Sequence, residues 1–106
     1  MNDEIKLTAR CPIRTTLELV GGKWKLLIIF QLRNGSLRLS ELRKQIPDIS
    51  EKMLIQELKF LVTSDLIIRT NYGEVPPKVA YTLTEKGFLA LPLVAEMQKF
   101  AIAYVG

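Results

Sequence analysis

The chain of 106 residues contains no histidine and only one cysteine, Cys11. The missing histidine excludes hydrolases of the usual Ser-His or Cys-His kind, because their general base is absent. One cysteine and no histidine also leave no zinc site of the usual ligand set, so we expect no metal and no other cofactor. A lone cysteine cannot form a disulfide within the chain, which is typical of a reducing cytoplasm. These absences predict a cytoplasmic protein that is not an enzyme.

Long apolar runs, linkers and repeats are missing as well. Unbroken apolar runs such as residues 26–30 are too short to span a bilayer, so we expect no membrane partner. The first ten residues carry acidic side chains and lack the apolar segment of a signal peptide. Without a Gly/Ser-rich linker, residues 1–106 are predicted to form a single domain, with a polar N-terminal arm over residues 1–9.

The charged residues give a modest positive excess. Fifteen Lys and Arg against eleven Asp and Glu leave a net charge of +4, which favours a polyanionic partner only weakly. The carboxylates are scattered singly, and the Gly21-Gly22 pair lacks the spacing of a phosphate-binding loop. The charge pattern therefore offers a binding surface but no catalytic pair.

The first two thirds of the chain has the apolar spacing of helices. Residues 12–20 and 23–33 are predicted as two helices that a glycine pair separates. Ser40 is predicted to cap a short third helix, which a Pro-Asp pair ends. Ser50 is predicted to cap a longer fourth helix. Its buried stripe is predicted to comprise Leu54, Leu58, Leu61 and Val62.

The period of the apolar residues then changes from about 3.6 to 2. Residues 66–72 and 79–83 are rich in β-branched and aromatic side chains, which predicts two strands of a hairpin over residues 66–83. Two prolines in the connecting GEVPP segment prevent regular ladder pairing, so this loop should project from the hairpin. Thr84 is predicted to cap a final helix over residues 85–105.

This order of elements predicts a winged helix-turn-helix, a mainly α fold with a small β-hairpin (α+β). Residues 39–64 would form the helix-turn-helix and residues 66–83 the wing. In such a fold the second helix of the motif enters the major groove of double-stranded DNA. The wing then reaches phosphates or the neighbouring minor groove.

The exposed face of the predicted recognition helix is basic and carries no acid. Gln56 can pair with adenine, Ile55 can contact a thymine methyl, and backbone N–H groups near Ser50 can hold a phosphate. The predicted DNA-contact residues are Arg43, Lys44, Ser50, Lys52, Ile55, Gln56, Lys59, Arg69 and Lys78. A stripe of this kind is by itself more often a solvated face, and winged helices also serve as protein-binding modules. A protein–protein interaction module is therefore the alternative.

The final predicted helix is more apolar than one side of a small domain requires. Between residues 88 and 105 only Glu96 and Lys99 are charged. A surplus apolar helix face usually marks an interface, most often two-fold, and the alternative is that it closes the monomer's own core. We predict a homodimer that pairs through its first and last helices. Its interface is predicted to include Leu17, Leu89, Val94, Met97, Phe100, Ala101 and Tyr104.

Several segments of the chain resemble one family of regulators. The segments are CPI at 11–13, LELVGGKWK at 17–25, LSELR at 39–43, EVPPKV at 74–79 and YTLTEKG at 81–87. Together they resemble the HxlR-type transcriptional regulators, winged-helix proteins related to the MarR group, over residues 11–93. The resemblance implies a dimeric bacterial DNA-binding regulator whose outer helices form the interface. Departures from the usual pattern at Glu51, Ile55 and Ala80 are expected to alter the operator sequence rather than the function.

Cys11 lies just before a predicted helix start, between Arg10 and Arg14. A helix dipole and nearby cations favour the thiolate, which is the reactive form. The resemblance adds that some family members sense oxidants or electrophiles through a cysteine in this segment. We therefore take Cys11 as a candidate redox sensor, with an oxidant or a small molecule as effector. The alternative is a small buried apolar side chain, and the sequence locates no small-molecule pocket.

Overall fold

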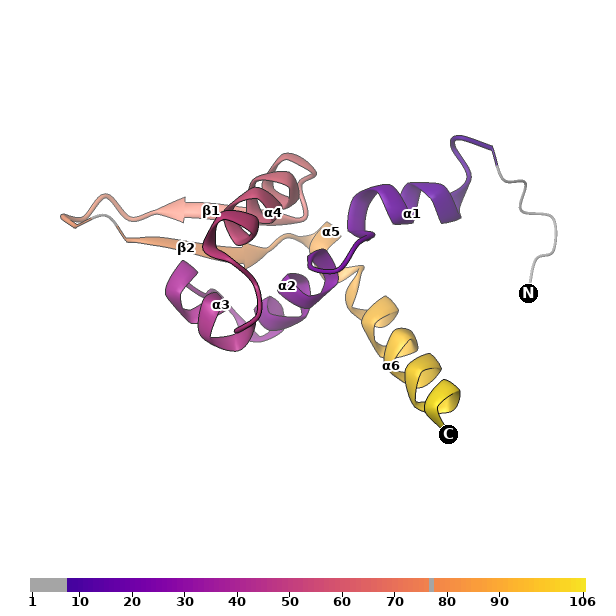
Figure 1. Cartoon of the computed structure of the whole chain (residues 1–106). Coiled ribbons are helices and arrows are strands. Elements are labelled where there is room, and N and C mark those ends of the chain that lie inside the picture. Colours follow the sequence, from indigo (N-terminus) through magenta and orange to yellow (C-terminus); the bar gives the residue numbers. More distant parts are fainter. Residues whose placement is uncertain (1–7, 77) are drawn as a thin grey trace.

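The computed structural model of the chain describes residues 8–76 and 78–106, so most of the predicted N-terminal arm lies outside the described residues. The elements in chain order are α1 (Pro12–Val20), α2 (Lys25–Gln31), the 3-10 helix η1 (Leu32–Asn34), α3 (Leu39–Gln45), α4 (Glu51–Thr63), β1 (Ile67–Asn71), β2 (Val79–Leu83), α5 (Glu85–Phe88) and α6 (Leu91–Val105) (Figure 1). Over the part of the chain that the structure describes, the helices accompany one two-stranded antiparallel hairpin, which extends outward beside α3 and α4 (Figure 1). This architecture confirms the predicted mainly α class with a small hairpin.

The hydrophobic core lies where α2, α3, α4 and the hairpin meet. Its fully buried large side chains are Ile28, Ile29, Leu32, Leu42, Leu54, Leu58, Leu61 and Ile67. Each side chain of this size stabilises the fold by about 1.5–3 kcal/mol when it leaves water. Three of these residues belong to α4, so the inward face of that helix is fixed by packing and its polar face must point outward.

The segment between α3 and α4 is a tight turn with its own apolar anchors. Ile46 and Ile49 are both buried at 4% exposure, although they flank a Pro-Asp pair at the surface. The hydroxyl of Ser50 accepts the N–H of Met53 at 3.1 Å and thereby starts α4 as predicted. The turn therefore holds the two helices of the motif at a defined angle.

The hairpin pairs β1 with β2 in antiparallel register, with Arg69 opposite Tyr81. Leu37, just before α3, extends this sheet by a single bridge. Its N–H donates to the Tyr81 carbonyl at 3.1 Å, and the Tyr81 N–H donates to the Leu37 carbonyl at 2.8 Å. At the far end, the N–H of Gly73 donates to the Asn71 side-chain oxygen at 2.9 Å. The wing is thus attached to the start of the helix-turn-helix rather than hanging free.

Two local predictions about these helices are wrong. Ser40 is not a cap, because α3 already begins at Leu39 and the N-cap is Arg38, whose N–H donates to the Glu41 carboxylate at 2.9 Å. Val62 is not part of the buried stripe and is 37% exposed. At 3.6 residues per turn, Val62 lies about 80° around α4 from Leu54, at the edge of the stripe.

The prediction of one helix over residues 85–105 is also wrong, since α5 ends at Phe88 and α6 begins at Leu91. Pro92 accounts for the break, because its ring would clash with the carbonyl four residues earlier, which is that of Phe88. Proline is tolerated in the first turn of a helix, and Pro92 lies in the first turn of α6. The predicted cap is confirmed, since the Thr84 hydroxyl accepts the N–H of Gly87 at 3.0 Å.

Two helices, α1 and α6, project from the core. Val20 is the one buried residue that α1 has after its cap, and α6 has none. The Cα radius of gyration is 15.5 Å, against about 13 Å for a compact chain of this length. Figure 1 shows α6 extending away from the helix-turn-helix and the hairpin. Both projecting helices therefore expose apolar faces that this single chain does not cover.

Residues Glu85–Val105 taken together are long and apolar enough to cross a membrane by length and composition alone, with a mean hydropathy of 1.4 in an unburied 18-residue window. The break before Leu91 leaves α6 with 15 residues. That helix is about 22 Å long, whereas the hydrocarbon core of a bilayer is about 30 Å thick. An exposed apolar helix of this length is better suited to packing against a second protein surface.

Candidate nucleic-acid interface

The outward face of α4 is polar and basic. Lys52, Gln56 and Lys59 recur at i, i+4 and i+7, and all three are exposed. Ile55 lies at the edge of the same face and is 37% exposed. Long side chains on a helix whose other face is fixed in a core are suited to reach base edges in a major groove.

The first turn of α4 favours an anion and already contains one. Free N–H groups and the helix dipole attract phosphate at such a helix start. Glu51 occupies this turn, and its carboxylate pairs with Arg43 of α3, with 3.9 Å between Oε1 and Nη1. Both side chains are about half exposed, so the ion pair is weak, and a phosphate can compete with Glu51 for Arg43.

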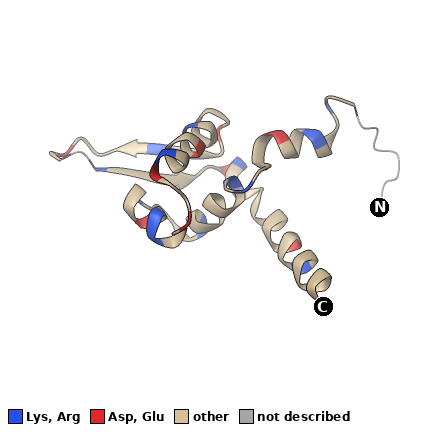
Figure 2. Cartoon of the chain, in the orientation of Figure 1, with Lys and Arg blue, Asp and Glu red and all other residues tan. Residues whose placement is uncertain are grey.

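Further basic side chains lie on α3 and on the wing (Figure 2). Lys44 on α3 and Arg69 on β1 are exposed. Lys78, just before β2, pairs with Glu74 across the wing loop at 2.8 Å between Nζ and Oε2. Of the nine residues predicted to contact DNA, five lie on α4 or at its cap, two on α3 and two on the wing.

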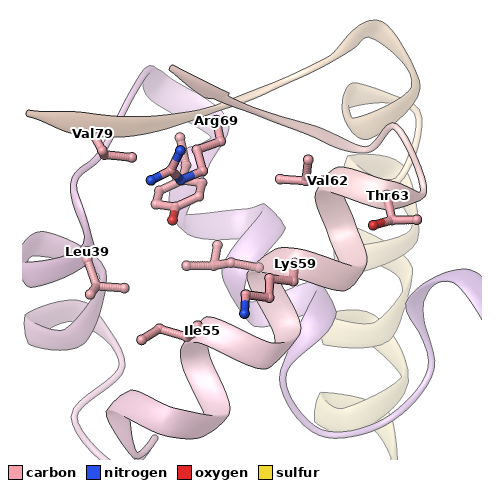
Figure 3. A pocket seen from close by; sticks show the side chains of 9 residues that line it. Leu39, Ile55, Lys59, Val62, Thr63, Arg69 and Val79 are labelled. Carbon is pink, nitrogen blue, oxygen red and sulfur yellow. The ribbon is translucent and has the colours of Figure 1, made fainter. Parts of the chain in front are cut away.

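Beside this face lies a hollow of about 530 Å³ that the sequence did not predict. Figure 3 shows Ile55, Lys59 and Val62 on α4, with Leu39, Val79 and Arg69 across from them. The residues that line the hollow are Leu39, Ile55, Leu58, Lys59, Val62, Thr63, Arg69, Val79 and Tyr81. One signal was available in the sequence: Ile55 and Val62 are seven residues apart, so they share a face of the helix that the core does not need.

The residues predicted for a dimer interface lie at the surface of this single chain. Phe100 and Tyr104 stack with 6.1 Å between ring centroids, and both rings are more than two thirds exposed. Leu17 of α1 and Leu89, between α5 and α6, are also largely exposed. The structure therefore leaves apolar side chains exposed on both helices that project from the core.

Cys11 is the N-cap residue of α1. Its Sγ accepts the N–H of Arg14 at 3.4 Å, and the residue is 4% exposed. The sulfur therefore takes the place that a serine or aspartate oxygen usually takes at a helix start. A reagent in solution can reach this thiol only when the start of α1 opens.

Metal ligands do not gather in residues 8–76 and 78–106, where no group of three or more Cys, Asp or Glu side chains could hold an ion. The polar features of the surface are instead single cations and isolated ion pairs. Such an arrangement can bind and neutralise a polyanion.

The chain is similar to known proteins in sequence and fold. A family model described as HxlR-like helix-turn-helix matches residues 19–106. The HTH-type transcriptional regulator YkvN of Bacillus subtilis (strain 168) is 47% identical over 87 residues, which cover 82% of this chain and 74% of that protein. A MarR-family transcriptional regulator from Porphyromonas gingivalis W83 superposes with a TM-score of 0.83 at 47% identity, covering 96% of this chain and 95% of that chain. The redox regulator HypR in its oxidized form gives a TM-score of 0.81 at 36% identity, with coverages of 88% and 96%.

Proposed function

The chain belongs to the HxlR-like helix-turn-helix family of transcriptional regulators, and on this premise we propose that it binds a two-fold DNA operator as a homodimer. It is a transcriptional regulator and not an enzyme. The proposal concerns how it reads DNA. In it, α4 lies in the major groove, and the wing contacts the backbone or the adjacent minor groove.

One observation carries this proposal: the exposed face of α4 is long, basic and free of acids. Lys52, Gln56 and Lys59 form this face. Gln56 can make two hydrogen bonds to adenine, and the flanking lysines can reach guanine or phosphate. The cations of α3 and the wing then hold the protein in register through phosphates.

The homodimer is supported by the unburied apolar face of α6 and by the exposed side of α1. A two-fold dimer presents two copies of α4, so it reads two half-sites about 34 Å apart or a multiple of that distance. The operator is then expected to be an inverted repeat. Because the two α4 helices belong to one dimer, binding of one half-site raises the effective concentration of the second helix at the other half-site. The dimer can therefore bind tightly even if each half-site contributes few contacts.

The experiment that tests the proposal is a selection from a random duplex DNA pool, followed by titration of the selected sequences against salt. We expect an enriched inverted repeat. We also expect an affinity that falls steeply with salt, because phosphate contacts release counterions. Binding with little salt dependence and no enriched motif would overturn the proposal and favour a protein–protein interaction module instead. The selection should be run once with reduced protein and once with diamide-treated protein, so that a regulator inactivated by oxidation is not mistaken for one that does not bind DNA.

We further propose that this regulator responds to oxidants or electrophiles through Cys11. The support is the position of its sulfur at the start of α1, where it accepts the Arg14 N–H at 3.4 Å. The similar fold of the redox regulator HypR adds to this. Diamide would remove two electrons and two protons from two thiols, so a disulfide must join Cys11 to a second copy or to a small thiol.

A further inference from the structure

A depression of about 350 Å³ lies where the start of α3, the first turn of α4 and the base of the wing meet. Its polar lining comprises Arg38, Ser40, Arg43, Glu51 and Lys78. These residues come from segments that lie far apart in the sequence, so only the folded chain assembles this surface. Leu39 and Val79 line both this depression and the hollow of Figure 3, so the two adjoin at the wing.

Three cations line the depression. Arg38 is the N-cap residue of α3, Arg43 lies on α3, and Lys78 lies just before β2. Arg43 and Lys78 pair with Glu51 and Glu74, and both carboxylates are about half exposed, so an incoming anion can replace them. Over the described part of the chain Arg38 takes part in no ion pair. The depression therefore combines one free cation with two cations whose partners can be exchanged.

The backbone of Arg38 is fixed while its side chain stays available. Its N–H donates to the Glu41 carboxylate at 2.9 Å, which holds the residue at the start of α3, and the residue is exposed. A guanidinium presents two parallel N–H groups to two oxygens of a phosphate. Ser40 lines the same depression without capping α3, so its hydroxyl can donate to the same anion.

The place of the depression determines which anion it meets. In the proposed complex α4 lies in the major groove, and the wing follows the backbone or the adjacent minor groove. One sugar-phosphate strand separates these two grooves, so it must pass between the start of α4 and the base of the wing. The depression lies at this position, because Glu51 of α4 and Lys78 of the wing both line it.

We infer that the depression holds one phosphate of this strand, and that Arg38 is a DNA-contact residue outside the predicted set of nine. The inference deepens the proposed function and rests on it. Arg38 binds the phosphate directly, while Arg43 and Lys78 exchange their carboxylates for it. A phosphate contact carries no base preference. Its role is to fix the position of the wing relative to α4 along the DNA.

The shared phosphate can be located with operator duplexes in which one phosphate at a time is replaced by an uncharged methylphosphonate. For the wild type we expect one position in each half-site where this replacement weakens binding about five- to twentyfold. For Arg38→Met the penalty at that position should be at least about threefold smaller, because one of the three cations is gone. Arg43→Met and Lys78→Met should reduce the penalty at the same position. Fluorescence anisotropy titrations measure each affinity.

Matched variants separate a phosphate contact from a general effect. Arg38→Met keeps the backbone N–H that starts α3, and its urea denaturation midpoint checks that it folds. Arg38→Lys keeps the charge and should retain most of the penalty. Arg10→Met removes the same charge before α1, across the molecule from the wing (Figure 1), and should retain all of it. A full penalty in Arg38→Met, or penalties that fall at different positions in the three Met variants of the depression, would overturn the inference.

A further titration distinguishes a DNA phosphate from a free one. Inorganic phosphate added to the DNA-free, isotope-labelled chain should give no saturable amide NMR shift at Ser40 or Val79 below about 10 mM. Saturation in that range would assign the depression to a free phosphate ligand and overturn the DNA assignment. An operator that binds without any Arg38-dependent position would overturn this inference and leave the proposed function intact. A chain that binds no duplex DNA at all would overturn the proposed function itself.

Discussion

Lys25 on α2 and Glu57 on α4 form an ion pair with 2.8 Å between Nζ and Oε2, and their side chains are only 17% and 16% exposed. The ammonium of Lys25 also lies 4.6 Å from the centroid of the Phe60 ring. Since α6 packs against α2, this pair connects α4, the proposed recognition helix, to the helix that supports the projecting α6. The orientation of α4 thus depends on a charged contact at the edge of the core.

Breaking one side of this pair should destabilise the protein. Glu57→Gln leaves the Lys25 ammonium largely buried without a carboxylate, so we expect the free energy of unfolding to fall by about 1–3 kcal/mol. Lys25→Met combined with Glu57→Met removes both charges and should stay within about 1 kcal/mol of the wild type. Urea denaturation at one fixed protein concentration measures both. A double variant that loses more than Glu57→Gln would show that the charge pair is not the cause.

The acid at the start of α4 should weaken DNA binding. Glu51→Gln frees Arg43 and removes a charge that repels phosphate, so we expect operator affinity to rise by about two- to tenfold. Random duplex should gain to a similar extent, because the effect concerns the DNA backbone. Fluorescence anisotropy titrations measure it. Glu18→Gln, which removes an exposed acid from α1, controls for net charge, and an equal gain there would contradict a local role of Glu51.

Base preference should depend on Gln56. Gln56→Ala removes the amide that pairs with adenine, so the preferred operator should lose about 1–3 kcal/mol of binding while other sequences change little. Lys44→Ala and Lys78→Ala should weaken all sequences alike and reduce the salt slope. Parallel titrations of the selected operator and its single-base variants separate the two classes. Unchanged preference in Gln56→Ala would place the recognition face elsewhere on α4.

The exposed apolar face of α6 should hold two chains together. Phe100→Glu places a charge in that face, so we expect its dimer dissociation constant to rise at least about 100-fold. Gln98→Glu adds the same charge elsewhere on α6 and should remain dimeric. Sedimentation over a dilution series measures both. A wild-type chain that sediments at one chain's mass throughout would refute the dimer, and its recovery on phosphatidylcholine vesicles would assign α6 to a membrane surface instead.

The response to oxidants should depend on Cys11. Serine can accept the same Arg14 N–H at the helix start, so Cys11→Ser should fold normally while losing thiol chemistry. We expect diamide to change the operator affinity of the wild type and to leave that of Cys11→Ser unchanged. Gel-shift titrations before and after diamide treatment measure the response. The same diamide response in both proteins would exclude Cys11 as the sensor.

The parts of the fold that local chemistry decides could be predicted from the sequence. Ser50 and Thr84 each cap a helix through a hydroxyl that accepts an N–H three residues later, an interaction that needs no distant partner. Three of the four residues predicted for the buried stripe of α4, and the presence of two strands, followed from apolar periodicity in the same way. Tertiary contacts decided the remainder. The bridge from Leu37 to Tyr81 joins residues more than forty positions apart, and no local sequence pattern predicts it.

The errors at the candidate site have physical causes of the same kind. Val62 is apolar and lies at the edge of the buried stripe of α4. Sequence spacing alone could not decide whether its side chain lies in the core or lines the hollow. The hollow itself forms from α3, α4 and both strands, and it exists only once those elements are assembled. The break before α6 could have been predicted, because a proline inside a helix clashes with the carbonyl four residues earlier, which for Pro92 is that of Phe88.

That break has a mechanical consequence for any operator the dimer reads. Only Leu89 and Ala90 join α5 to α6. The helix that would contact the second subunit is therefore attached to the rest of the domain through a two-residue connection. A rigid continuous helix would fix the separation of the two α4 helices by its length alone. With a two-residue connection, that separation depends on how α6 packs against α2 and against α6 of the second subunit. Substitutions at Leu89 or Ala90 are therefore expected to change the preferred half-site spacing, while the base preference within each half-site stays the same.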